Sequence, residues 1–126
     1  MSSKWFDLRR FFAFSPDHVD DFLKNESVRN VLRKQGDNCK ASRLIDHYAY
    51  FSTPETRASY REFIVSRGYQ VKLEDVSATD DGRVVIIFCK LQAPIAIDNE
   101  TVLLEDHATQ LGGEYDGWET EVIRRA

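Results

Sequence analysis

The sequence predicts an α+β domain in which two helices cover one face of a four-stranded antiparallel sheet. Segments with the apolar pattern of β-strands occur four times after residue 43, and two segments with helical spacing of apolar residues separate them. The chain has 126 residues, of which 42% are hydrophobic, so it can bury a core without disulfides or metals. We predict one compact domain with two parts, a helical extension over residues 1–42 and a β-α-β-β-α-β unit over residues 43–126.

The first third of the chain has the pattern of helices. Residues 4–14 have the spacing of a short amphipathic helix. Ser15 and Pro16 are typical of the N-cap and first position of a second helix. The apolar stripe of this second helix changes phase, so we expect a kink or break near Asn25. Gly36 opens a turn, which predicts that the helical region ends before it.

The β-α-β-β-α-β unit begins with a strand and a helix. Residues 44–51 are rich in aromatic and β-branched side chains, which favours a strand. Ser52 and Glu55 then have the spacing of a capping box, and Pro54 suits the first turn of a helix. We expect this helix to run to about Arg67.

The next two strands differ in their pattern. Residues 69–74 alternate between apolar and polar side chains, which predicts an edge strand with one solvated face. Residues 84–91 are almost continuously apolar, which predicts a central strand that is covered on both faces. Residues 80–82, Asp-Asp-Gly, are typical of the turn between them.

A second helix and a last strand complete the unit. Asp98 or Asn99 is expected to cap the helix, Gly112 and Gly113 stop it, and the last strand is expected to end near Ile123. The apolar stripe of this helix consists of Thr101, Leu104, Ala108 and Leu111. The order of elements is that of the ferredoxin-like sandwich, for which we predict the strand order 4-1-3-2.

Charge is distributed unevenly along the chain. Residues 1–45 carry nine Lys/Arg and six Asp/Glu, whereas residues 46–126 carry eight and fifteen. An acidic body repels phosphate backbones, so we expect a basic protein partner and no direct binding of nucleic acid. The third strand, residues 83–90, also lacks the aromatic signature of RNA-recognition modules.

The cysteines and the hydropathy pattern predict a cytoplasmic protein. Cys39 and Cys89 do not form a CxxC pair, and we interpret them as structural thiols of a reducing compartment. Cys39 is expected in a loop, where a reactive thiol is the less favoured alternative. We see no signal peptide pattern and no apolar run long enough to span a membrane, so membrane binding is not expected.

The sequence offers no catalytic pattern, and we expect no enzyme, metal or cofactor. His18 lies among acidic residues at the expected start of a helix. His107 follows Glu105 and Asp106, and residues one or two positions apart on a helix do not face each other. His47 follows Asp46 in a strand, so their side chains point to opposite faces. A hydrogen-bonded, partly buried histidine is therefore the favoured interpretation of His47.

The first and last strands lie side by side in the predicted sheet, and their alternation predicts a polar open face. On the last strand Trp118 is expected to face the core, and the residues alternating with it face solvent. Tyrosines provide contact area and carboxylates select basic partners. The predicted partner-binding residues are Asp46, Tyr48, Tyr50, Tyr115, Glu119 and Glu121. The alternative is that the N-terminal helices cover this face, with Trp5, Phe11 and Phe12 packed on the tyrosines.

Four runs of residues resemble one known family in order and spacing. They are Ile45–His47, Gly68–Val71, Val85–Cys89 and the most specific, Glu114–Thr120, which contains Tyr-Asp-Gly-Trp. Over residues 43–123 the chain resembles the regulator of ribonuclease E activity B family, protein inhibitors of that endoribonuclease. The resemblance implies a ferredoxin-like domain of the bacterial cytoplasm, which binds the ribonuclease by protein contact and modulates RNA decay without catalysis.

The chain also departs from the family pattern. Members of the best-known type are strongly acidic and carry an acidic tail, whereas this chain has a net charge of −4 and a mildly basic N-terminal segment. The alternative function is therefore a binding module of the same fold, such as an immunity or adaptor protein, with a different basic partner.

Overall fold

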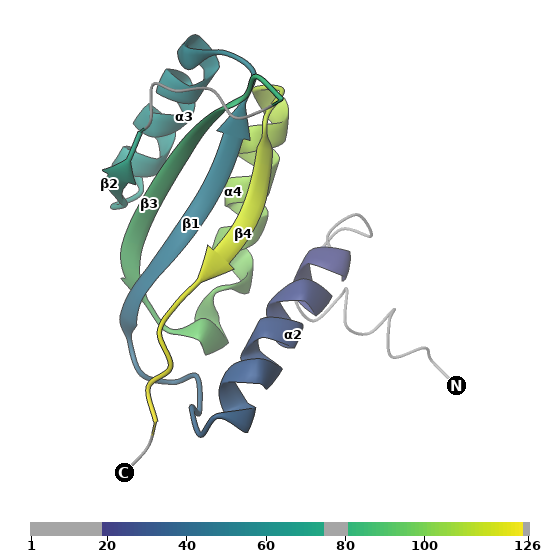
Figure 1. The fold of residues 1–126 in the computed structure, drawn as a ribbon, viewed down its shortest axis with the longest axis vertical. Helices are drawn as coiled ribbons and strands as arrows, with labels where there is room; N and C mark the ends of the chain where they lie inside the picture. The colour runs from purple at the N-terminus through teal and green to yellow at the C-terminus, as the bar shows by residue number, and fades with distance from the viewer. Residues whose placement is uncertain (1–18, 75–80, 125–126) are drawn as a thin grey trace.

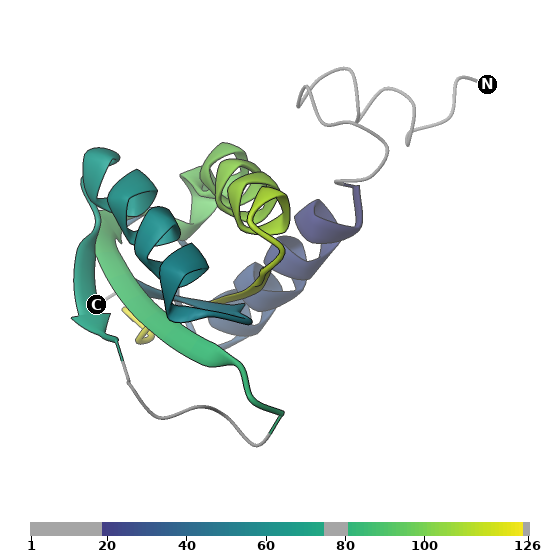
Figure 2. The same ribbon diagram turned by 90° about the horizontal axis from the view of Figure 1, so that it is seen from above.

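A computed structural model describes residues 19–74 and 81–124 of the chain (Figure 1). Its sheet is antiparallel with the order β2-β3-β1-β4, which is the predicted order read from the other edge. Helices α3 and α4 lie together on one face of the sheet (Figure 2). The predicted fold class is confirmed. In chain order the elements are α2 (Val19–Lys34), β1 (Arg43–Phe51), α3 (Pro54–Ser66), β2 (Gln70–Leu73), β3 (Val84–Gln92), the 3-10 turn η2 (Pro94–Ala96), α4 (Asp98–Gln110) and β4 (Glu114–Glu119).

The core lies between the sheet and the two helices α3 and α4. The central strands β1 and β3 contribute alternate residues to it, α3 contributes Tyr60 and Ile64, and α4 contributes Leu104 and Ala108. Burying these side chains is the main stabilising contribution to the fold, at about 25 cal/mol per Å² of apolar surface. The buried members of this cluster are Ala49, Phe51, Tyr60, Ile64, Tyr69, Val84, Ile86, Phe88, Leu104 and Ala108.

Helix α3 begins one residue later than the predicted cap. The Thr53 hydroxyl, rather than that of Ser52, accepts a hydrogen bond of 3.1 Å from the backbone N–H of Thr56. Thr53 has the extended backbone of an N-cap, which leaves Pro54 in the first turn, where its missing N–H costs nothing. The helix ends at Ser66, so the predicted end near Arg67 is confirmed.

Helix α2 is continuous, and the predicted kink near Asn25 is wrong. The buried residues of this helix are Asn25, Arg29 and Leu32, which have regular helical spacing. The stripe changes phase in the sequence because two of these three buried positions hold polar side chains. Hydrogen bonds to α4 compensate their burial, so a pattern based on hydrophobicity alone cannot detect the face. The helix ends at Lys34, before Gly36, as predicted.

The described part of the N-terminal extension does not cover the open face of the sheet. Helix α2 packs beside α4 and along the β4 edge, where the Asn25 amide donates hydrogen bonds of 2.9 Å to Asp98 and Thr101. No described helix crosses the face of the sheet that is turned toward the viewer in Figure 1. The predicted helix over residues 4–14, with Trp5, Phe11 and Phe12, lies outside the described residues.

Strand β4 ends at Glu119, so the prediction that it continues to about Ile123 is wrong. The backbone that follows is bound by side chains instead of by a neighbouring strand. The Ile123 N–H donates to the Asp37 carboxylate at 2.9 Å, and the Arg43 guanidinium donates to the Glu121 carbonyl at 3.3 Å. Asp37 and Arg43 form a buried ion pair of 2.8 Å, which holds the pKa of Asp37 well below its usual range.

Candidate protein-binding surface

The open face of the sheet presents one side chain from every second position of β1 and β3. Because the two strands are antiparallel and in regular register, these side chains form rows across the sheet. Strand β4 adds Glu119 next to Asp46 and Glu114 next to Tyr50. The rows formed by β1 and β3 are Leu44 with Leu91, Asp46 with Cys89, Tyr48 with Ile87, and Tyr50 with Val85.

Four predicted partner-binding residues lie together on this face. The Lys72 ammonium donates to the Asp46 carboxylate at 2.7 Å. The Tyr48 hydroxyl donates to the carboxylate of Glu119, and this hydrogen bond raises the pKa of Tyr48 to about 12. The prediction that Asp46, Tyr48, Tyr50 and Glu119 share one face is confirmed.

An arginine that the sequence analysis did not single out completes the other end of this face. The Arg83 guanidinium carbon lies 4.7 Å from the centre of the Tyr50 ring. The same side chain pairs with Glu114 and Asp81, each at 2.7 Å. The carboxylates of this face therefore occur together with two cations, Lys72 and Arg83, so the face carries mixed charge.

Tyr115 lies on the opposite side of the sheet, and the prediction that it shares the polar face with Glu119 is wrong. The register between β1 and β4 shifts between Tyr48 and Ala49, where β4 has a bulge. Tyr48 pairs with Gly117 and Ala49 with Tyr115, so one extra residue reverses the alternation. Gly117 has a φ of 124°, which favours glycine and allows this bulge.

The Tyr115 hydroxyl contacts His47 in the core. His47 is completely buried, with its Nδ1 atom 2.8 Å from the Tyr115 hydroxyl and its Nε2 atom 2.8 Å from Gln92 Oε1. Gln92 donates its amide to Tyr69, so its oxygen accepts the proton of His47 Nε2, and Tyr115 donates to the neutral Nδ1. Burial lowers the pKa of His47 to about 4. The favoured interpretation of His47 as hydrogen-bonded is confirmed, although its burial is complete.

Glu121 lies beyond the end of β4. Its side chain is exposed, and its carbonyl accepts from Arg43. The sheet register does not extend to Glu121, so alternation along β4 does not set its direction. Glu121 therefore comes after the last residue of β4 in the sequence and does not belong to the rows of side chains on the open face.

Two exposed leucines at one end of the open face were not recognised in the sequence. Leu44 and Leu91 are direct partners on β1 and β3, and they are 56% and 67% exposed. Exposed single leucines are common, but two that face each other across neighbouring strands form an apolar contact surface. The available signal was the alternation of β1, which places Leu44 in phase with the polar residues of that strand.

The described residues contain neither a metal-type cluster nor an exposed cysteine. Within residues 19–74 and 81–124, no group of three His, Cys, Asp or Glu side chains is arranged to hold a metal ion. No described helix combines the length and the apolar character needed to cross a membrane. Cys39 lies in a loop as expected but is fully buried, and burial raises the pKa of its thiol. Cys89 is also buried, so neither thiol has the exposure of a reactive cysteine.

Comparison with protein families gives one match that covers most of the chain. Residues 23–120 match the family described as regulator of ribonuclease activity B. The chain belongs to the regulator of ribonuclease activity B family. The match extends from within α2 to the end of β4, so the helix before the sheet is part of the family domain. No curated protein matched the chain. Membership of the regulator of ribonuclease activity B family implies that the protein regulates ribonuclease activity.

Proposed function

We propose that this protein is a non-catalytic regulator of the bacterial cytoplasm that binds an E-type endoribonuclease directly and modulates RNA decay. The observation that carries the proposal is the family match over residues 23–120. The open face of the sheet, formed by alternate residues of β1, β3 and β4, is the proposed contact surface. It supports the proposal because no described helix covers it (Figure 1).

The side chains of the open face suit protein contact. Tyr48 and Tyr50 are half-buried and combine a large apolar ring with a polar hydroxyl, as is common in interfaces. Leu44 and Leu91 add apolar surface, and its removal from water by a partner would make the free energy of binding more favourable. Together they would form the desolvated centre of an interface, with charged residues at its rim.

The charge of the β4 edge favours a basic partner. Glu114, Asp116 and Glu119 on β4 and Glu121 beyond it are all exposed, and residues 46–126 carry a clear excess of acids. Carboxylates at a rim attract a basic partner and set the orientation in which it binds. Added salt screens such attraction, so binding should weaken as ionic strength rises.

The direct test is calorimetric titration of the full chain against an E-type ribonuclease and, separately, against its scaffold region. Wild-type protein should bind at low salt. Glu119→Lys should weaken binding about tenfold, or about 1.4 kcal/mol, because it replaces an attractive charge by a repulsive one. Glu62→Lys is the matched control: it makes the same charge change at an exposed position of α3, on the other face of the sheet. Equal effects of the two substitutions would remove the open face from the proposal, and no binding at low salt would contradict the ribonuclease as partner.

A second pair of variants tests the apolar end of the face. Leu91→Ser should weaken binding while leaving the thermal midpoint almost unchanged, because Leu91 is 67% exposed in the free protein. Leu103→Ser on α4 is the control, since Leu103 is also exposed but lies on the helix side of the sheet. Unchanged binding by Leu91→Ser would restrict the interface to the charged end of the face.

A further inference from the structure

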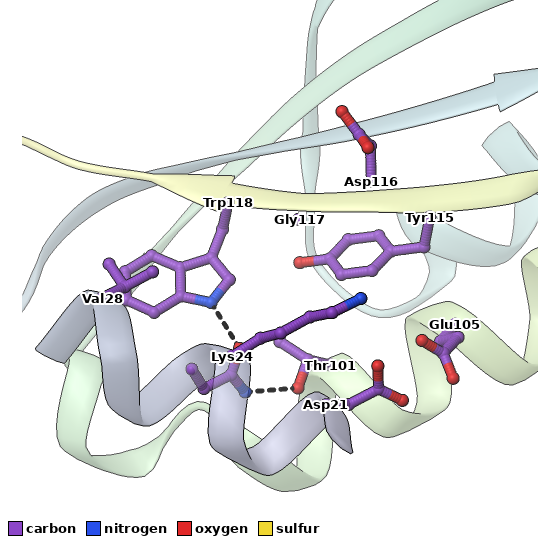
Figure 3. Close-up of a pocket in the computed structure, with 10 residues that line it drawn as sticks. Asp21, Lys24, Val28, Thr101, Glu105, Tyr115, Asp116, Gly117 and Trp118 are labelled. Carbon is purple, nitrogen blue, oxygen red and sulfur yellow. Dashed lines mark hydrogen bonds between the residues drawn. The ribbon is translucent and has the colours of Figure 1, made fainter. Parts of the chain in front are cut away.

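A cavity of about 170 Å³ lies between α2, α4 and β4, on the other side of β4 from the open face (Figure 3). The β4 bulge creates its aromatic wall. Residues three apart on a regular strand face opposite sides, but the bulge turns both Tyr115 and Trp118 toward the helices. The cavity is lined by Asp21, Lys24, Asn25, Val28, Thr101, Glu105, Tyr115, Asp116, Gly117 and Trp118.

The inner part of the cavity is preformed. Asn25 accepts a hydrogen bond of 2.8 Å from the Trp118 indole N–H and donates one of 2.9 Å to the Thr101 hydroxyl. All three residues are buried, so these bonds fix both the ring of Trp118 and the spacing of α2 from α4. A ligand would therefore enter a rigid site, which reduces the entropy lost on binding.

The mouth of the cavity carries carboxylates from two helices. Asp21 comes from α2 and Glu105 from α4, and both are partly buried. Burial raises the pKa of Tyr115 well above its ordinary value, and the charges of Glu105 and Asp21 add to this effect. The two carboxylates place negative charge beside the aromatic wall, as a site for a cation requires.

A cationic side chain already extends across this cavity. Lys24 is exposed on α2, and Figure 3 shows its aliphatic stem crossing the cavity with the ammonium directed toward Tyr115 and Glu105. A flexible lysine with an exposed head can leave such a position at little cost. Lys24 therefore indicates the type of group that the cavity accepts, a cation at the end of an aliphatic chain.

We propose that this cavity receives one arginine side chain of a bound protein, which takes the place of Lys24. A planar guanidinium has five N–H donors in a fork and can bridge two carboxylates on different helices, whereas an ammonium acts as a point charge. Its flat face also suits the rings of Tyr115 and Trp118. The inference rests on the proposed function only for the source of the arginine, because the site itself is separate from the open face.

The test uses a small probe, so that its failure is distinguishable from failure to bind a ribonuclease. The full chain is titrated with Nα-acetyl-arginine amide at low salt, and binding is followed by the NMR signals of the Trp118 indole N–H and the Asn25 side-chain amide. The arginine probe should shift both signals in a saturable way. Nα-acetyl-lysine amide should bind more weakly than the arginine probe. Nα-acetyl-citrulline amide, the uncharged isostere of the arginine probe, should not bind. Equal shifts by the arginine and citrulline probes, or no saturable shift, would overturn the proposal.

Variants of the cavity mouth give the second readout. Lys24→Ala should tighten binding of the arginine probe at least threefold, because it removes the competing side chain. Lys34→Ala is the matched control, since Lys34 is exposed at the other end of α2 and the change in net charge is the same. Glu105→Gln should weaken binding at least threefold, whereas Asp106→Asn, at an exposed neighbouring position of α4, should change it less than twofold. Equal effects within either pair would show non-specific charge attraction and overturn the proposal.

Discussion

The indole nitrogen of Trp118 donates a hydrogen bond of 2.8 Å to the side-chain oxygen of Asn25, which lies 93 positions earlier in the chain. Asn25 in turn donates its amide to Thr101 and Asp98 of α4, each at 2.9 Å. One buried amide thus connects α2, α4 and β4. Polar contacts therefore attach helix α2 to the sheet domain. The weak apolar stripe of α2 did not predict these contacts.

Asn25→Ala should destabilise the protein by about 1–3 kcal/mol, because the buried indole N–H of Trp118 loses its acceptor and the Thr101 hydroxyl loses a donor. Urea unfolding of the wild type and the variant measures the difference. Asn30→Ala on the same helix is the control, since Asn30 is exposed and its side chain accepts an exposed hydrogen bond from Arg33. A change of less than 0.5 kcal/mol, which is typical of surface positions, would be expected for this control. Similar losses for both variants would contradict the role of Asn25.

Trp118→Ala should cost about 3–5 kcal/mol, the range for truncation of a buried large aromatic residue. Trp118 is 8% exposed and packs against the cluster that contains Leu32, Ile45 and Ile97. Trp118→Phe should cost less, since it keeps most of the apolar contact and loses chiefly the hydrogen bond to Asn25. The thermal midpoint of each variant checks the order. A midpoint for Trp118→Ala equal to that of the wild type would mean that the side chain is not buried.

Stability should fall as pH is lowered from about 6.5 to 4, because of His47. Burial lowers the pKa of His47 to about 4 in the folded protein, whereas an unfolded histidine has a pKa of about 6.5. Between these values the unfolded state binds the additional proton, so the free energy of unfolding rises with pH. The shift corresponds to a contribution of up to about 3 kcal/mol, fully present above the unfolded pKa.

Urea unfolding at several pH values, together with NMR titration of the His47 ring, measures this effect. His47→Gln should be less stable at pH 7 but should lose the additional slope between pH 6.5 and 4. A His47 ring that titrates near 6.5 in the folded protein would contradict the prediction.

The two glycines at the end of α4 should respond differently to alanine. A Cβ atom on Gly113 would lie 2.3 Å from a ring carbon of Phe51 and 2.6 Å from the Tyr50 carbonyl oxygen. Gly113→Ala should therefore cost about 1–3 kcal/mol through overpacking of the core. A Cβ atom on Gly112 would have no neighbouring atom within 4 Å. The loss of stability for Gly112→Ala should be about 1–2 kcal/mol, because alanine disfavours the left-handed backbone with its φ of 74°.

The urea midpoints of the Gly113→Ala and Gly112→Ala variants measure this difference in stability. Near-UV circular dichroism distinguishes the two variants further. Gly113→Ala should change the aromatic signal, because Phe51 and Tyr50 must move, whereas Gly112→Ala should leave it unchanged. A greater loss of stability in Gly112→Ala would contradict the close packing at Gly113.

The order of elements and most of the core followed from local sequence patterns. Thr101, Leu104 and Ala108 of the predicted stripe are buried and Leu111 is half-buried, because helical spacing decides which side chains share a face. The central position of β3 followed from its continuous apolar run, and the resemblance around Glu114–Thr120 indicated the family that the match over residues 23–120 establishes.

The buried face of α2 depended on its partners. Asn25 and Arg29 are polar, and acceptors of η2 and α4 help to make their burial favourable. Arg29 donates to the Pro94 carbonyl and to Asp98, each at 3.0 Å, and also to Glu26 in its own helix at 2.6 Å. The partners in η2 and α4 cannot be inferred from a local pattern, since they lie more than sixty positions away in the chain.

The sequence by itself determined which residues of β1 face the core, which helices cover the sheet and that Trp118 is buried. Tertiary structure alone decided the side on which Tyr115 lies. Alternation along a strand is a local property, but a bulge arises where two strands pair, and one extra residue moves every side chain beyond it to the other face. The same bulge places Tyr115 against His47, forms the wall of the cavity with Trp118 and leaves Glu119 on the open face.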